Sequence, residues 1–187
     1  MTLHYLAKRV RPDILAAVSF CATRVLAPSE QDLIKRKRIL GYLSNTLDQK
    51  LLLKIGARMQ VRAYVDSSFG TYQDGKSVTG TIIFLGEAPV YFKSSKQKIV
   101  TRSSTEAELI GISDALSQIL WMREYVLHQN IVVGPVILFQ DNKSTIFLAS
   151  KGDQPVNAHI TLRLDIFSSH TTFKQMKLLL STCPLNL

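Results

Sequence analysis

The chain has few residues of the kinds that mark secreted or membrane proteins. Only two cysteines occur in 187 residues, Cys21 and Cys183, and they belong to no metal-ligand spacing, which favours reduced thiols. No apolar run approaches the roughly 18 residues of a membrane span. The N-terminal residues lack the regions of a signal peptide. These absences predict an intracellular protein with no membrane association, and they leave the compartment open.

Acidic residues are also scarce, since 14 Asp and Glu stand against 23 Lys and Arg, a formal net charge of +9. The excess lies mainly in residues 1–60, with 11 basic and 4 acidic residues, whereas residues 61–187 hold 12 and 10. A basic segment beside a nearly neutral one is compatible with a polyanionic partner. Basic helices are also common as solvated faces, so charge alone leaves both interpretations open.

The first 50 residues predict two short helices. Apolar residues recur at helical spacing over 12–25, after Pro12-Asp13. A second helix begins near Ser29, where Asp32 has the spacing of a capping box. Two short helices are too few to close a core alone, so we expect this part to accompany one larger domain.

From about residue 59 the pattern changes to β-structure. Strands are predicted at 60–65, 79–85 and 90–93, joined by short connections as in an antiparallel meander. Ser103 is placed to cap a long helix over 104–129, with Glu106 reaching back to the Ser103 N–H. A buried parallel strand at 136–140 and a helix over 142–151 follow. The order β-β-β-α-β-α predicts an α/β fold, a mixed sheet with helices packed on it.

Three carboxylates occupy special places in this order. Asp66 and Asp141 each follow an apolar run, and Glu108 lies about one turn into the long helix. If the two strands are parallel neighbours, these acids meet at one edge of the sheet. Crowded carboxylates repel each other, and a divalent cation such as Mg²⁺ or Mn²⁺ removes that penalty. Two such ions could support phosphodiester cleavage.

Each acid also has a simpler interpretation. Asp66 could belong only to a turn, and Asp141 with Asn142 could serve only as a helix N-cap. Glu108 could be a solvent-facing acid in the first helical turn. Glu106 is more typical of a cap than of a metal ligand. The residue pattern alone does not decide between a metal site and these structural roles.

Six short motifs in one order make the pattern more specific: Tyr64-Val65-Asp66-Ser67-Ser68-Phe69, Ser77-Val78-Thr79-Gly80, Phe84-Leu85-Gly86, Lys93-Ser94-Ser95-Lys96-Gln97, Ser103-Ser104-Thr105-Glu106-Ala107-Glu108 and Gln140-Asp141-Asn142-Lys143-Ser144. The series resembles the ribonuclease H domain of Ty1/copia-type retrotransposon polyproteins. Upstream, Arg11-Pro12-Asp13-Ile14 and Arg38-Ile39-Leu40-Gly41-Tyr42-Leu43 resemble the end of the preceding reverse transcriptase region. On this basis residues 1–55 form a helical remnant of the reverse transcriptase region, 59–165 a ribonuclease H-like domain, and 166–187 an atypical tail.

The resemblance implies a ribonuclease H-like fold that cleaves the RNA strand of an RNA–DNA hybrid with two Mg²⁺ (or Mn²⁺) ions. It places the metal-binding acids at Asp66, Glu108 and Asp141. It also implies other parts of a retroelement polyprotein as partners. Phosphate contacts are expected between the third strand and the long helix, from these basic residues, although a solvated loop explains them equally well: Lys93, Lys96, Lys98 and Arg102.

The sequence also departs from the family pattern. The family's closing Ala-Asp-x-x-Thr-Lys-like segment, which supplies a fourth acid, is absent, and Asp165 is poorly placed to replace it. His159 and His170 fit ordinary surface positions. Without an Asp-Asp pair, polymerase activity is excluded. Two hypotheses therefore remain, an active ribonuclease H and an inactive remnant that keeps the fold and at most binds nucleic acid. A purely structural interaction module gains nothing from the acid pattern.

Overall fold

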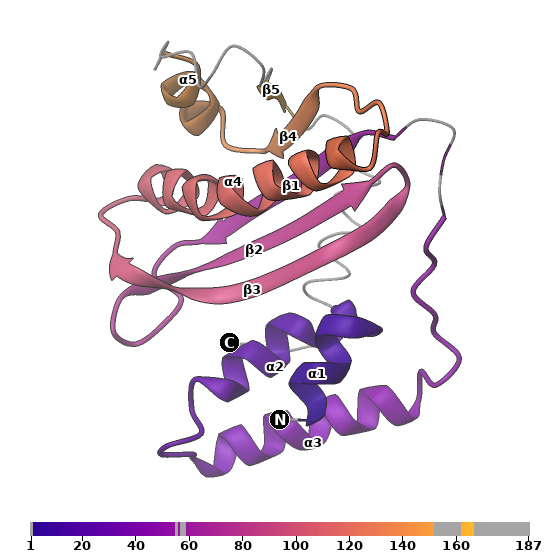
Figure 1. Cartoon of the computed structure of the whole chain (residues 1–187). Coiled ribbons are helices and arrows are strands. Elements are labelled where there is room, and N and C mark those ends of the chain that lie inside the picture. The colour runs from indigo at the N-terminus through magenta and orange to yellow at the C-terminus, as the bar shows by residue number, and fades with distance from the viewer. Residues whose placement is uncertain (1, 55, 57–58, 152–161, 167–187) are drawn as a thin grey trace. The chain divides into compact units, whose positions relative to one another are not determined.

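A computed structural model describes residues 2–54, 56, 59–151 and 162–166 (Figure 1). The chain divides into two compact units, a helical one formed chiefly by the first 51 residues and an α/β one formed chiefly from residue 52 onward. The atypical tail, Cys183, His159 and His170 lie outside the described residues. Within the described part of the chain, no helix is long and apolar enough to cross a membrane.

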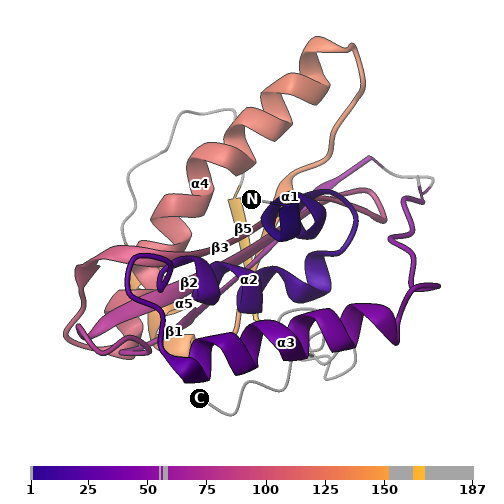
Figure 2. The same cartoon turned by 90° about the horizontal axis from the view of Figure 1, so that it is seen from below.

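The described residues of the helical unit form three α-helices, and the prediction of two was incomplete. Helix α1 spans Thr2–Arg9, a 3-10 turn covers Pro12–Ile14, α2 spans Leu15–Ala22 and α3 spans Glu30–Ser44. Helix α2 lies beside α3 (Figure 2). Helix α1 was missed because its eight residues carry too short an apolar pattern to stand out. The buried hydrophobic residues among the described residues of this unit are Ala7, Ile14, Leu15, Ala17, Val18 and Ile39.

Local polar contacts fix the ends of these elements. The predicted capping box at Ser29 is confirmed, since the Asp32 N–H donates to Ser29 Oγ and the Ser29 N–H donates to Asp32 Oδ2. The guanidinium of buried Arg11 donates to both carboxylate oxygens of Asp13 and to the carbonyl and hydroxyl oxygens of Thr46. Arg11 thereby ties the 3-10 turn to the residues that follow α3.

The α/β unit is built on a five-stranded sheet of order β3-β2-β1-β4-β5. The strands are β1 (Val61–Ser68), β2 (Lys76–Leu85), β3 (Ala88–Val100), β4 (Val136–Gln140) and β5 (Leu162–Ile166). Strand β1 pairs antiparallel with β2 and parallel with β4, and β4 pairs parallel with β5. In Figure 2 the strand direction rotates from β3 to β5, the usual twist of a sheet. The predicted α/β class and mixed sheet are confirmed.

Helix α4 (Ser104–His128) covers one face of this sheet, and its buried side packs on β1 and β2 (Figure 1). The shared core is aliphatic and consists of Val61, Ala63, Val65, Ile83, Ile112, Ala115, Ile119, Met122, Val136 and Leu138. Alternate residues of β1 and β4 point to the other face, where the rings of Tyr64 and Phe139 stack with centroids 4.6 Å apart. Helix α5 (Lys143–Lys151) follows β4.

Strands β1 and β2 extend about three residues beyond the predicted 60–65 and 79–85, and two other strands differ more from the prediction. Strand β3 is 13 residues long, whereas only 90–93 was predicted, because its second half is polar and carries little intrinsic β-signal. Strand β5 was not predicted in this chain, and it extends the sheet beyond β4. In both cases pairing with a neighbouring strand sets the extent of the strand, and the local sequence does not.

Candidate metal centre

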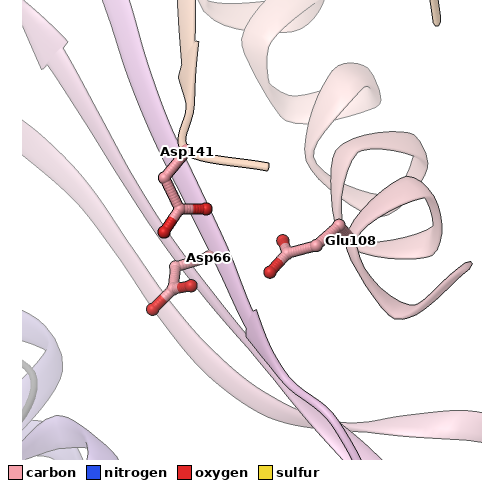
Figure 3. Close-up of side chains that lie close together, drawn as sticks. All are labelled: Asp66, Glu108 and Asp141. Carbon is pink, nitrogen blue, oxygen red and sulfur yellow. The ribbon is translucent and has the colours of Figure 1, made fainter. Parts of the chain in front are cut away.

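The three acids singled out in the sequence converge at one edge of the sheet. Asp66 lies in β1, opposite Gly80 of β2, and Asp141 directly follows β4. Because β1 and β4 are parallel neighbours, their carboxyl ends meet. Glu108 points toward the two aspartates from the N-terminal part of α4 (Figure 3). One carboxylate oxygen from each acid lies within 4.8 Å of the others.

Glu108 is held in this direction by two hydrogen bonds. The backbone N–H of Ser67 donates to Oε1 over 3.2 Å, and Gln140 Nε2 donates to Oε2 over 3.0 Å. The Glu108 residue is only 5% exposed, whereas Asp66 is half-buried and Asp141 is exposed. The cluster therefore has one inner carboxylate, fixed by the protein, and an outer side that solvent reaches.

Close packing of α4 against the sheet brings Glu108 near Asp66 and Asp141. Gly111 lies one turn beyond it, and a Cβ there would stand 2.5 Å from Ser67 Oγ and 3.1 Å from Thr79 Cγ2. Only a residue without a side chain allows this approach. Buried Gln97 of β3 adds a polar contact, because its Nε2 donates to the Ala107 carbonyl (2.9 Å) and to Thr79 Oγ1 (2.8 Å).

Gly111→Ala is therefore expected to destabilise the protein by about 1–3 kcal/mol, because the methyl group overlaps Ser67 on a face that cannot give way. The higher helix propensity of Ala, about 1 kcal/mol, offsets only part of this. Gly41→Ala in α3 is the matched control, since nothing lies within 4 Å of a Cβ there, and it should be neutral or stabilising. Urea unfolding measures both, and equal effects would contradict the close approach.

The electrostatic environment reflects the crowding of negative charge. Burial raises the pKa of Glu108 from its ordinary value of 4.5 to about 7, and the charge of Asp66 adds to this. The hydrogen bonds from Gln140 and Ser67 oppose the shift, and Asp141 contributes a smaller increase. The folded protein thus resists placing a third negative charge here unless a cation compensates it.

The simpler interpretations of the acids do not describe this structure. Asp66 is an internal residue of β1 and not part of a turn. Asn142 caps α5, because its Oδ1 accepts from the Thr145 N–H over 3.1 Å, and Asp141 is left to the cluster. Glu108 is buried, not solvent-facing. Ser103 caps α4 as predicted, because its Oγ accepts from the Glu106 N–H, but Glu106 Oε2 accepts from the Arg102 N–H and not from that of Ser103 as predicted.

The predicted phosphate contacts are placed differently from the expectation. Lys93, Lys96 and Lys98 lie within β3, and only Arg102 lies between β3 and α4. Lys98 and Arg102 are exposed. Lys96 Nζ pairs with Asp74 Oδ2 at 2.7 Å and lies 4.4 Å from the centroid of the Tyr72 ring. The four residues thus do not form a loop, and one of them already has an anionic neighbour.

Sequence reasoning missed the residues that hold the acids in place. Gln97 and Gln140 are 3% and 1% exposed, and both donate from their amides to the N-terminal part of α4. One signal was present: Gln140 continues the alternation of Val136 and Leu138, both buried, so its polar side chain had to face the interior. Asp165, the candidate fourth acid, lies in β5 with Phe139 as its register partner.

Comparison with known proteins shows which proteins the chain is related to. It is 35% identical over 151 residues to the retrovirus-related Pol polyprotein from transposon RE1 of Arabidopsis thaliana, and 28% identical over 148 residues to the transposon Ty1-LR3 Gag-Pol polyprotein of Saccharomyces cerevisiae. The chain is homologous to Ty1/copia-type retrotransposon Pol polyproteins. These matches cover 80% and 76% of the chain, which spans about a tenth of the length of these relatives. No family model matches the chain.

The α/β unit of this Pol homologue has the element order β-β-β-α-β-α-β. A solved structure, LC11 ribonuclease H1 in complex with an RNA/DNA hybrid, covers 64% of this chain and 75% of the solved chain. Its TM-score is 0.36 and its identity 14%, a likeness too low to add weight. The resemblance to Ty1/copia-type retrotransposon polyproteins found in the sequence motifs is confirmed by these matches.

Proposed function

We propose that this Pol homologue is a ribonuclease H that hydrolyses the RNA strand of RNA–DNA hybrids with divalent metal ions. The observation that carries the proposal is the convergence of Asp66, Glu108 and Asp141 at the edge of a ribonuclease H-like sheet. The first 55 residues, under the same proposal, correspond to the end of a reverse transcriptase region. Other parts of a retroelement polyprotein are the expected partners.

The donor set fits a hard divalent cation. All three groups offer carboxylate oxygens, the ligands that Mg²⁺ and Mn²⁺ prefer, and they lie close enough to share ions. Burial of Glu108 beside Asp66 leaves a negative charge that such a cation would stabilise. Asp66, Glu108 and Asp141 would hold two ions, whose chemistry when bound is the activation of water and the stabilisation of the leaving oxygen.

The protein's own groups provide orientation and access. The N–H groups of Ser67 and Gln140 fix the inner carboxylate of Glu108, so that it need not reorganise during the reaction. Asp66 and Asp141 lie toward the open side, where a phosphodiester can approach. Lys93, Lys96, Lys98 and Arg102 would contact phosphates of the hybrid and set its register without reading its sequence.

The experiment that tests this proposal follows cleavage of a hybrid labelled on the RNA strand, with Mg²⁺ and with EDTA. Cleavage of RNA only in the hybrid, and only with Mg²⁺, is the expected result. Cleavage that persists in EDTA would contradict a metal centre. Double-stranded DNA of the same sequence is the substrate control.

A second candidate function is a non-catalytic remnant that keeps the fold and binds nucleic acid. It is favoured by the size of the cluster, which among the described residues contains three acids, while the family pattern includes a fourth. Salt-sensitive binding of the hybrid without any Mg²⁺-dependent cleavage by the wild-type chain would support this candidate and reject the first.

Asp74→Asn is expected to bind hybrid about two- to fivefold more tightly at low salt. Asp74 Oδ2 forms an ion pair with Lys96 Nζ and lies 4.0 Å from Lys76 Nζ. It therefore competes with a phosphate for both ammonium groups. The pair is partly exposed, which keeps the effect small and lets salt remove it. Fluorescence anisotropy measures the affinity. In a Lys96→Met background the same change should have much less effect, and an undiminished gain would contradict a role for Lys96.

A further inference from the structure

Gln140 is the last residue of β4. Its side chain forms hydrogen bonds with the carboxylate of Glu108 and with the backbone N–H of Asp141, two of the three acids. Its residue is 1% exposed, so its amide must find partners within the protein. A long apolar side chain would be the ordinary choice at this position, since Val136 and Leu138 of the same strand face are buried and apolar. The amide therefore calls for an explanation.

The hydrogen bonds of Gln140 fix which way its amide points. Its Oε1 accepts from the backbone N–H of Asp141 over 2.8 Å and from that of Asn142 over 3.4 Å. Turning the amide over would place NH₂ against these two donors and leave them unsatisfied. The Nε2 group is consequently directed at Glu108 Oε2, at 3.0 Å.

This arrangement leaves room for a cation on Glu108. An ionised carboxylate has about four lone-pair sites, and the N–H groups of Ser67 and Gln140 occupy one on each oxygen. A hydrogen bond of this kind orients a metal-ligating carboxylate without displacing the metal. The same amide also fixes the backbone from which the Asp141 side chain leaves β4.

We propose that Gln140 is a positioning residue that holds Glu108 and Asp141 as one unit for binding of a divalent cation. The inference rests on the proposed function only for the presence of the ion, not for cleavage. Under this proposal, the hydrogen bonds of one buried amide connect helix α4 to residues 141–142, which follow β4. Gln140 touches neither substrate nor ion.

The test measures binding of Mn²⁺ alone by isothermal titration calorimetry, with fold stability measured by urea unfolding in EDTA. Gln140→Met keeps the length of the side chain and removes both hydrogen-bonding functions. We expect its Mn²⁺ affinity to fall by about 10- to 100-fold relative to the wild type. Gln140→Asn is a second variant in case the first does not fold, because it keeps an acceptor near the 141–142 N–H groups but cannot reach Glu108. The same loss is expected.

Gln97→Met is the matched control. Gln97 is similarly buried and also donates to α4, but it bonds the Ala107 carbonyl and no carboxylate. It should lower the free energy of unfolding by a similar amount while changing Mn²⁺ affinity much less. An equal loss of affinity in Gln97→Met would overturn the proposal, because any loosening of α4 would then suffice. Unchanged affinity in both Gln140 variants would overturn it directly.

The outcomes separate this inference from the proposed function. If the wild type binds Mn²⁺ through Gln140 but cleaves no hybrid, the positioning role stands and the ribonuclease activity fails. If the wild type cleaves hybrid and the Gln140 variants bind Mn²⁺ like the wild type, only the positioning role fails. If the wild type binds no Mn²⁺ at all, the positioning role is overturned together with the metal centre.

Discussion

Asp66→Asn is expected to lower Mg²⁺-dependent cleavage of the RNA strand by about a thousandfold or more. The substitution keeps the size of the side chain but removes one of three anionic ligands from the strand edge where β1 and β4 meet. Weaker ion binding and poorer charge stabilisation together account for several kcal/mol of the activation barrier, and each 1.36 kcal/mol is tenfold in rate. Single-turnover cleavage of a labelled hybrid at saturating protein measures the change.

Asp114→Asn is the matched control for this prediction. Asp114 is an exposed residue of the same helix as Glu108, so the substitution makes the same change in net charge away from the cluster. It should leave cleavage within about twofold of the wild type, as expected of a surface substitution. Equal product from the wild type and Asp66→Asn would contradict ribonuclease activity at this site, whatever the control shows.

The stability of the metal-free protein is expected to fall as pH rises from about 4.5 to above 7. The pKa of Glu108 is about 7 in the folded state and near its ordinary value of 4.5 when unfolded. The folded state therefore binds more protons between these values, and stability decreases with pH across that window. A shift of this size corresponds to a loss on the order of 3 kcal/mol, complete above the folded-state pKa.

Urea unfolding in EDTA at several pH values between 5 and 8 measures this dependence. Glu108→Gln should flatten the curve, because the titrating group is gone. Its absolute stability is a poorer readout, since Gln140 Nε2 would lose an ionised acceptor. Saturating Mg²⁺ should also flatten the wild-type curve, because a bound cation favours the ionised carboxylate. A wild-type curve in EDTA with the same slope as Glu108→Gln would contradict the raised pKa.

Several features that depend on a few neighbouring residues were predicted correctly. The capping box at Ser29 and Asp32 involves groups three residues apart, and the structure contains it as predicted. The apolar run at 136–140 is a parallel strand as predicted, although only Val136, Leu138 and Gln140 are fully buried in it. The long helix over 104–128 followed equally from its cap and its periodicity.

Other features depended on partners distant in sequence. The polar second half of β3 becomes a strand through its place in the sheet, and β5 is a strand through pairing with β4. One local feature was also wrongly predicted, since Glu106 accepts a hydrogen bond from the N–H of Arg102 and not from that of Ser103. Lys96 meets Asp74 only because the β1–β2 connection and β3 lie close together.

The sequence by itself determined the order β-β-β-α-β-α after residue 59, the relation to Ty1/copia-type Pol polyproteins, and which three acids to examine. It could not determine whether they meet, because carboxylates that are 42 and 33 residues apart along the chain converge only through strand pairing and helix packing. The tertiary structure alone made Glu108 the buried member, through Gly111 and the N–H of Ser67. It also identified Glu108 as the partner of Gln140, since the alternation along β4 indicates that Gln140 is buried but not which group 32 residues away it contacts.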